Sequence, residues 1–293
     1  MARRMVGMMA VLNKNYFNGR QMVTCYSCHR GSDHPKVTAS LAAIYGGSTE
    51  DEEDDIVRQA PGAPSPDQLF DKYLEALGGT GRLAGLTSVV ATGTSSGYGP
   101  ESEKRPIEIF AQAPNRRTLV IHTDNGDNTT AYDGRGAWVA APLRPIAVLP
   151  LTGGDLYGAR LDAELAFPSR IKQAFGQWRV GRQSVIADRK VEVVQGVSAD
   201  GAAMATFYFD AETGLLVRLM RYASSPVGRM ATQFDYADYR EVSGVKMPFR
   251  WTMTWLDGRE NVELTEVRPN VAIDAAKFAK PAPSVAPSKP ATR

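Results

Sequence analysis

The stretch Phe207-Tyr-Phe-Asp-Ala-Glu-Thr-Gly-Leu-Leu-Val-Arg218 decides the fold. Strand-forming aromatic and branched residues lie on both sides of a polar segment that ends in Gly214, and glycine supplies the positive φ that a tight hairpin needs. Further hairpin signals stand at Tyr132-Asp-Gly-Arg-Gly-Ala-Trp138 and Trp255-Leu-Asp-Gly-Arg259. Successive hairpins of this kind predict an antiparallel sheet.

Strand-like runs extend on both sides of this hairpin. They are Ser88 to Ser95, Ile107 to Ala113, Arg117 to Thr123, Thr129 to Tyr132, Ala137 to Ala141, Ser184 to Ala187, Lys190 to Val197, Ala203 to Asp210, Leu215 to Tyr222, Arg229 to Tyr239, Lys246 to Trp255 and Glu260 to Val267. Such a sheet curls or closes, because a large flat sheet exposes its edges. Apolar spacing predicts helices over Asp67 to Leu77 and Leu161 to Phe175. The predicted fold class is therefore α+β.

Composition divides the 293 residues into four parts. Residues 1–45 are Met-rich and basic, and they contain both cysteines. Residues 46–65 combine an acidic run with prolines and predict a flexible linker, with a solvated loop of one continuous domain as the alternative. Residues 66–280 form the β domain, and the proline-rich residues 281–293 predict a disordered tail. The net charge of +2 and the lack of a basic cluster interleaved with aromatics argue against a nucleic-acid partner.

The motif Cys25-Tyr-Ser-Cys-His29 carries the chemistry. Two thiols at this spacing can form thioethers with the vinyl groups of a haem, and His29 follows as the proximal iron ligand. A thioredoxin-like pair would lie in a βαβ unit, which does not surround this motif. Structural zinc needs four ligands, whereas this chain has two cysteines and three histidines. The motif therefore predicts one covalent haem c and an electron carrier rather than an enzyme.

Methionine is the candidate for the second axial ligand. Met5, Met8, Met9, Leu12 and Tyr16 share one face of a helix that should end near Asn18-Gly19. That helix rises about 16 Å. The residues from 17 to 24 can return roughly 26 Å when extended, which brings Cys25 beside the helix. A methionine on this face can therefore meet the iron opposite His29, with simple core filling as the alternative role.

The segments Arg3-Arg-Met-Val-Gly-Met-Met-Ala-Val-Leu-Asn13 and Val23-Thr-Cys-Tyr-Ser-Cys-His-Arg-Gly31 resemble one haem-binding block of the cytochrome c subunit of photosynthetic reaction centres. The resemblance covers residues of about 3 to 36. It implies that Cys25, Cys28 and His29 bind the haem and that Met5, with Met8 as the alternative, is the distal ligand. Family members typically carry four haems, whereas this chain has one block.

The resemblance implies electron transfer with a redox partner protein, either soluble or membrane-associated. Basic residues near the haem, which are Arg20, Arg30 and Lys36, would steer an acidic partner. Haem attachment also implies the periplasm. The apolar run before Asn13 is short for a signal peptide and no cleavage site follows it. We therefore expect a further N-terminal segment with an export signal to precede Met1.

The hairpin at residues 207–218, together with Asp235-Tyr-Ala-Asp-Tyr-Arg-Glu-Val-Ser-Gly-Val-Lys-Met-Pro-Phe249, resembles the fold of periplasmic lipoprotein carriers and outer-membrane lipoprotein-sorting proteins. In that fold a curved antiparallel sheet, a half-barrel, wraps a helix and can hold an acyl chain. Two functions therefore compete. One is a mono-haem c-type cytochrome whose β domain docks a partner, and the other is a carrier of an apolar or lipid ligand with a sensory or vestigial haem segment.

Overall fold

The chain divides into two units in the structure, a computed structural model that describes residues 2–29, 57–97, 103–142, 145–199, 201, 203–225, 228–255 and 258–281. One unit is Met1–Val57 with Ala223–Met230, and the other, called the β domain below, is Arg58–Tyr222 with Ala231–Arg293. Within the β domain, the Ala60 amide donates to the Val180 carbonyl at 2.8 Å. Most of the predicted linker, the tail beyond residue 281 and residues 30–45 of the predicted haem module lie outside the described residues.

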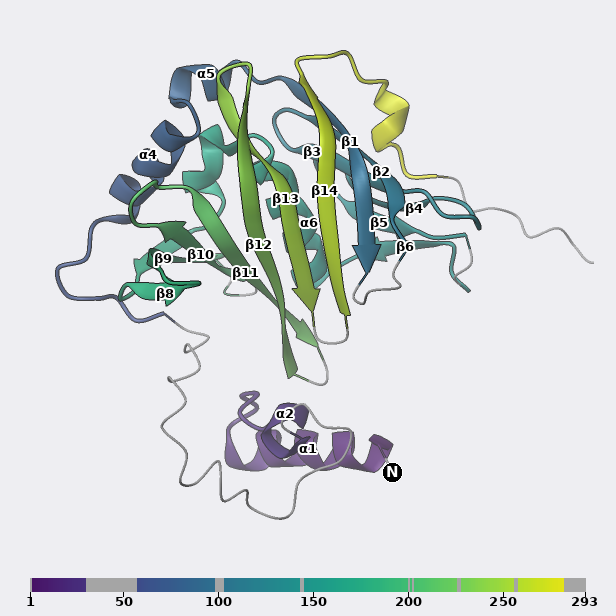
Figure 1. The fold of residues 1–293 in the computed structure, drawn as a ribbon. Coiled ribbons are helices and arrows are strands. Elements are labelled where there is room, and N and C mark those ends of the chain that lie inside the picture. Colours follow the sequence, from purple (N-terminus) through teal and green to yellow (C-terminus); the bar gives the residue numbers. More distant parts are fainter. Residues whose placement is uncertain are drawn as a thin grey trace, which may run out of the picture. The chain divides into compact units, whose positions relative to one another are not determined.

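One antiparallel sheet of 14 strands dominates the fold, in the order β6-β5-β4-β3-β2-β1-β14-β13-β12-β11-β10-β9-β7, with β8 paired to β9 (Figure 1). Its strands are β1 (Ser88–Gly97), β2 (Arg105–Gln112), β3 (Arg116–Ile121), β4 (Asn128–Tyr132), β5 (Ala137–Ala140), β6 (Val148–Leu151), β7 (Gln177–Val180), β8 (Ser184–Ile186), β9 (Arg189–Val197), β10 (Met204–Asp210), β11 (Leu216–Ser225), β12 (Gly228–Val242), β13 (Val245–Trp255) and β14 (Gly258–Pro269). The first and last strands pair at its centre. The sheet curves but does not close, which confirms the predicted α+β class with a large antiparallel sheet.

Helix α4 (Pro66–Ala76) lies within one residue, at each end, of the helix predicted over Asp67 to Leu77. Ser65 and Gln68 form a capping box, in which each side chain accepts a hydrogen bond from the backbone N–H of the other. After the short helix α5 (Thr80–Ala84), the next helix differs from expectation. The prediction of one helix over Leu161 to Phe175 is wrong, because α6 spans Gly153–Leu165 and a separate 3₁₀ helix, η1, spans Pro168–Gln173.

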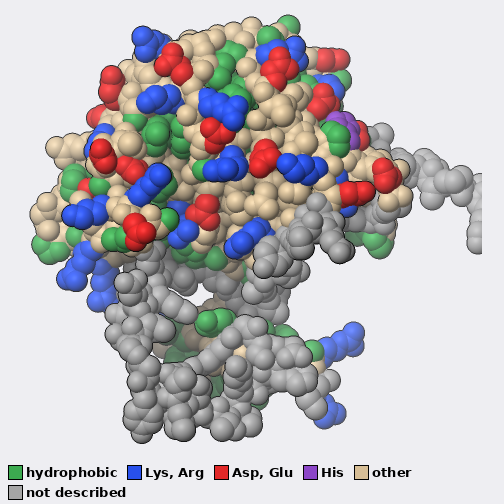
Figure 2. Space-filling model, viewed as in Figure 1, with side chains coloured by type: hydrophobic (Ala, Val, Ile, Leu, Met, Phe, Trp, Pro, Cys, Tyr) green, Lys and Arg blue, Asp and Glu red, His purple; other side chains and the backbone are tan. Residues whose placement is uncertain are grey.

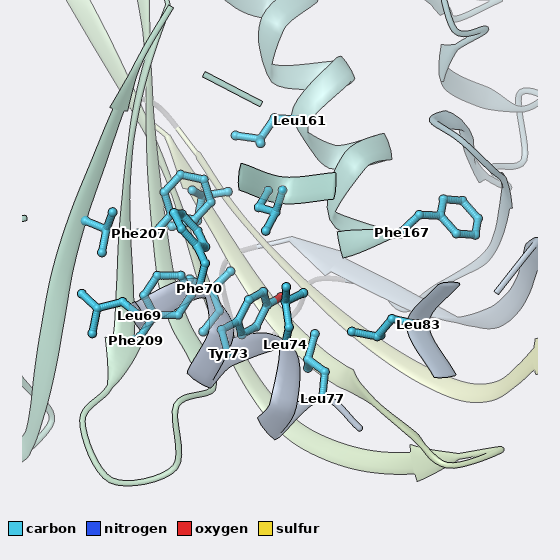
Figure 3. Close-up of a cluster of buried hydrophobic side chains, with 14 of the residues drawn as sticks. Leu69, Phe70, Tyr73, Leu74, Leu77, Leu83, Leu161, Phe167, Phe207 and Phe209 are labelled. Carbon is cyan, nitrogen blue, oxygen red and sulfur yellow. The ribbon is translucent and has the colours of Figure 1, made fainter. Parts of the chain in front are cut away.

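Helices α4, α5, α6 and η1 pack on one face of the sheet, called the inner face below. Figure 3 shows Phe70 of α4 beside Phe207 and Phe209 of β10, and its ring packs edge-on against both. The ring centroids of Phe70 and Trp178 are 4.6 Å apart, in an edge-to-face arrangement. This aromatic core fixes α4 to the β7–β10 arm of the sheet.

The outer face of the sheet is covered where the C-terminal 3₁₀ helix, η2 (Ala275–Phe278), crosses it. Phe278 is buried there against Val90, Phe110 and Val120 from β1, β2 and β3. These strands are consequently apolar on both faces. Elsewhere on the face seen in Figure 2, acidic and basic side chains are interspersed, as on an ordinary solvated surface.

The N-terminal unit contains helix α1 (Ala2–Tyr16) and the short helix α2 (Cys25–His29). Helix α1 ends as predicted, with Asn18 and Gly19 both at positive φ. The buried Asn13 side chain joins this helix to the following loop: its amide donates to the Val23 carbonyl at 2.7 Å, and its oxygen accepts from the N–H groups of Met22 and Val23. Among the described residues, every helix is too short or too polar to span a lipid bilayer.

Candidate functional site

A cavity of about 360 Å³ lies in the β domain on the inner face of the sheet. Its wall is mostly apolar. The apolar lining residues are Tyr73, Leu77, Leu83, Leu86, Val89, Ala91, Ile109, Leu119, Ile121, Leu165, Ala166, Pro168, Leu216, Phe234, Tyr236, Tyr239, Val245, Met247, Pro248, Trp251, Met253, Val262, Leu264 and Val267. The polar ones are Arg117, Thr130, Asp162, Arg221, Lys246 and Glu260. Several apolar residues, including Leu119, Trp251 and Met253, are only half-buried, so the space among them is not filled by protein.

Strand alternation places the lining residues. On β3, Arg117, Leu119 and Ile121 share the inner face and line the cavity. The residues between them face outward: the Thr118 hydroxyl donates to the Lys277 carbonyl at 2.9 Å, and Val120 packs near Phe278. Because η2 covers the face of β3 that carries Thr118 and Val120, the two-residue period of the strand places Arg117 on the face that lines the cavity.

An ion pair forms part of the polar wall. Arg221 of β11 donates to the Asp162 carboxylate of α6 at 2.7 Å, and each side chain is 22% exposed. The same guanidinium lies 4.7 Å from the centroid of the Phe234 ring. Gly158 of α6 leaves room for it, because a Cβ at that position would lie 2.9 Å from the guanidinium. The pair thus joins helix α6 to strand β11.

Three tyrosines also line the cavity: Tyr73, Tyr236 and Tyr239. Burial raises the pKa of each of their phenols. Tyr239 donates to the Leu216 carbonyl at 2.8 Å. For Tyr236, burial is the largest influence, Asp162 and Tyr73 raise the pKa further, and Arg221 and Arg117 lower it. All three hydroxyls therefore remain protonated at neutral pH and can act as hydrogen-bond donors.

The Cys25-to-His29 motif forms helix α2 in the other unit. Both cysteines are exposed free thiols, and their spacing of three residues places them on one face of the helical turn. Thr24 precedes the helix, and its N–H donates to the Ser27 hydroxyl at 3.0 Å. His29 ends the helix and is half-buried. Two accessible thiols and an adjacent imidazole are the donor set that covalent haem attachment requires.

The two candidate distal ligands differ in exposure. Met5 is half-buried on α1, on the same face as Met9, which is 6% exposed, whereas Met8 is 52% exposed. Several large apolar side chains of this segment remain exposed: Val6, Met8, Val11, Tyr16, Phe17, Met22 and Tyr26. Among the residues that the structure describes, no group of three or more His, Cys, Asp or Glu side chains could hold a metal ion. Arg20 is exposed, and Arg30 and Lys36 lie outside the described residues.

Sequence reasoning did not select any polar residue of the cavity. Arg117, Asp162 and Arg221 carry no motif, and they lie far apart in the sequence. The one local indication is that Arg117 lies two residues before Leu119 in a strand, which places both side chains on the same face of the sheet. The sheet curvature and helix α6 bring these residues to one cavity.

No protein-family model matches the chain, and no curated protein matches it. Several solved structures have a similar fold. A DUF1329 family protein from Desulfovibrio piger gives a TM-score of 0.52 at 10% identity, over 73% of this chain and 96% of that chain. A putative outer membrane lipoprotein-sorting protein domain from Vibrio parahaemolyticus gives a TM-score of 0.50 at 12% identity, over 72% and 97% of the two chains. A LolA superfamily protein from Nitrosomonas europaea gives 0.50 at 14% identity, over 74% and 99%. The β domain therefore has a LolA-like fold.

Proposed function

We propose that the β domain is a carrier-like binding domain that takes up an apolar ligand, such as an acyl chain of a lipid or lipoprotein, in the cell envelope. The observation that carries this proposal is the apolar cavity of about 360 Å³ on the inner face of the sheet. Ligand pockets commonly span roughly 300–1,000 Å³ and are mostly apolar with a few polar groups, and this cavity meets both conditions. Two proteins with the same fold are named for the LolA superfamily and for lipoprotein sorting, which supports the same ligand class and a periplasmic location.

Titration with an uncharged single-chain amphiphile, methyl dodecanoate, tests the proposal. All four tryptophans of the chain, at positions 138, 178, 251 and 255, belong to the β domain, and Trp251 lines the cavity. We expect saturable binding that changes the intrinsic fluorescence. Ala91→Phe should weaken this binding at least about tenfold, because it places a ring in the cavity.

Thr92→Phe is the matched control, since Thr92 is the next residue of β1 and points to the opposite face. Urea unfolding of each variant verifies that it folds. Absence of saturable binding to the wild-type chain would refute the proposal, and so would equal affinity of a folded Ala91→Phe variant.

A second function, electron transfer through one haem c, is favoured by the Cys25-to-His29 helix. Its support is the pair of exposed free thiols on one helical turn, together with the exposed apolar side chains of the same segment, which a large flat apolar cofactor could cover. Cys25 and Cys28 would hold the haem covalently, His29 and Met5 would be its axial ligands, and the haem would exchange single electrons with a redox partner.

A haemochrome spectrum tests this second function. The protein is expressed with a c-type maturation system and denatured in alkaline pyridine. We expect a covalent haem band for the wild-type chain and none for the double variant Cys25→Ser with Cys28→Ser. If the wild-type chain retains no haem through denaturation, the cytochrome hypothesis is wrong, whereas the proposal for the cavity is unaffected.

A further inference from the structure

Arg117 is a charged side chain in a mostly apolar cavity, and no ion pair to it occurs within the described residues. It is half-buried on β3. The nearby acidic residues of α6 are already paired, Asp162 with Arg221 and Glu164 with Arg160, both at 2.7 Å. A guanidinium that is partly desolvated without a counter-charge is costly, so this wall carries an excess of positive charge that an anion would compensate.

Hydrogen-bond donors converge on the same wall from distant strands. Arg117 and Tyr236 stand on β3 and β12, which are separated in the sheet by β2, β1, β14 and β13. Both nevertheless line the cavity, and each lies within electrostatic range of the other across it. No hydrogen bond to the Tyr236 hydroxyl is found among the described residues, while the Tyr239 hydroxyl is already used by the Leu216 carbonyl. An anionic group beside Arg117 could therefore accept from a guanidinium and a phenol together.

The cavity is apolar beyond this polar wall. Strand alternation directs into it the apolar side chains of Ala91 on β1, Ile109 on β2, Leu119 and Ile121 on β3, and Val262 and Leu264 on β14. The lining thus offers a guanidinium and a phenol beside a large apolar wall.

We propose that the cavity binds a single-chain amphiphile with an anionic head group, whose head lies at Arg117 and Tyr236 and whose acyl chain lies along the apolar wall. The inference rests on the proposed function of the β domain. The volume favours one chain with a small head group, since about 360 Å³ is at the lower end of ligand pockets. A carboxylate and a phosphate share the required chemistry.

Isothermal titration with three probes of equal chain length tests the head-group site: dodecanoate, dodecyl phosphate and methyl dodecanoate. For the wild-type chain we expect at least one anion to bind about tenfold or more tightly than the ester. Arg117→Gln should abolish this preference, and Arg117→Lys should retain part of it. Arg116→Gln is the matched control, because Arg116 is the adjacent exposed residue of β3 and does not line the cavity; it should leave the preference unchanged.

The outcomes separate the two proposals. If the ester binds as tightly as both anions to the wild-type chain, or if folded Arg117→Gln retains the full preference for the anion, the head-group site is wrong while the apolar cavity stands. If no probe binds, the carrier function itself fails and this inference fails with it. The comparison of anion with ester on the wild-type chain needs no variant, so it holds even if Arg117→Gln does not fold. The tighter of the two anions identifies the head group.

Discussion

Substitution of Asp210 should destabilise the hairpin of β10 and β11 on which the fold depends. One oxygen of the Asp210 carboxylate accepts three hydrogen bonds, from the N–H of Glu212 at 3.0 Å, the N–H of Thr213 at 2.7 Å and the Thr213 hydroxyl at 3.0 Å. The residue is 7% exposed. Burial raises the pKa of Asp210, but the hydrogen bonds and the charge of Arg189 together lower it by more. The pKa of Asp210 therefore lies below its ordinary value of 3.8.

The size of the effect follows from this geometry. A hydrogen bond to a charged group contributes about 1.5–3 kcal/mol, but the three bonds share one acceptor and the freed N–H groups lie in a turn that water reaches. We expect Asp210→Ala to lower the free energy of unfolding by about 2–4 kcal/mol and Asp210→Asn, which keeps an acceptor oxygen, by about 1–2 kcal/mol.

The pH dependence has a definite sign. Because the folded-state pKa of Asp210 is depressed, its carboxylate stabilises the fold above the unfolded pKa, and this contribution is lost as the pH falls through the folded value. The difference in stability between wild type and Asp210→Asn should therefore be full at neutral pH and shrink below about pH 4.

Urea unfolding followed by tryptophan fluorescence measures these differences in the β domain, where all four tryptophans lie. Glu212→Ala is the control, since it changes a neighbouring exposed carboxylate of the same turn and leaves the backbone donor in place. The reasoning is refuted if Asp210→Ala changes stability by less than about 0.5 kcal/mol, which is the range of an ordinary surface substitution. It is also refuted if the deficit of Asp210→Asn is the same in acid as at neutral pH.

Other predictions follow from the packing and from the haem hypothesis. Gly196→Ala should lower the free energy of unfolding by about 1–3 kcal/mol in the same assay, because its Cβ would lie 2.5 Å from the Phe175 ring and 2.7 Å from the Trp178 ring; unchanged stability would contradict this contact. In haem-loaded protein, Met5→Ala should abolish the weak long-wavelength sulfur-to-iron band of the oxidised form and Met8→Ala should leave it; the reverse result would assign Met8. The double variant Cys25→Ser with Cys28→Ser should bind methyl dodecanoate with unchanged affinity, measured by fluorescence titration, since the cavity is lined by residues of the β domain alone.

The hairpins were predictable because their signals are local. The stretch from Phe207 to Arg218 became β10 and β11, with Gly214 at a φ of 76° in the turn between them. The prediction of one helix over Leu161 to Phe175 was wrong for an equally local reason. Its apolar residues keep helical spacing across Pro168, but a proline disfavours the helical conformation of the residue before it, and Phe167 lies outside the helical region, at φ −133° and ψ 69°. The spacing of the apolar residues favoured one continuous helix, although Pro168 was a signal in the sequence that the helix ends before it.

Elements that depend on tertiary contacts were missed. Strand β6, at one edge of the sheet, contains Pro150, which weakens a strand pattern although an edge tolerates it. Asn13 was also missed: a polar residue near a helix end reads as solvated, yet it is 7% exposed and its amide holds the loop that leads to Cys25. The prediction that Cys25, Cys28 and His29 bind haem came from a motif, and it rests on that motif and on the exposure of the thiols.

The proposed head-group site depends on a choice that a strand pattern leaves open. Arg116 and Arg117 are adjacent, and the two-residue period of β3 requires that one of them point inward, but it does not say which. Thr118 and Val120 continue the face of Arg116, while Leu119 and Ile121 continue the face of Arg117, so both faces are apolar enough to be buried. The choice is made by the C-terminal segment, because η2 covers Thr118 and Val120 and leaves the other face to the cavity. The position of the Arg117 guanidinium, and with it the proposed ligand chemistry, is therefore set by residues about 160 positions further along the chain than Arg117.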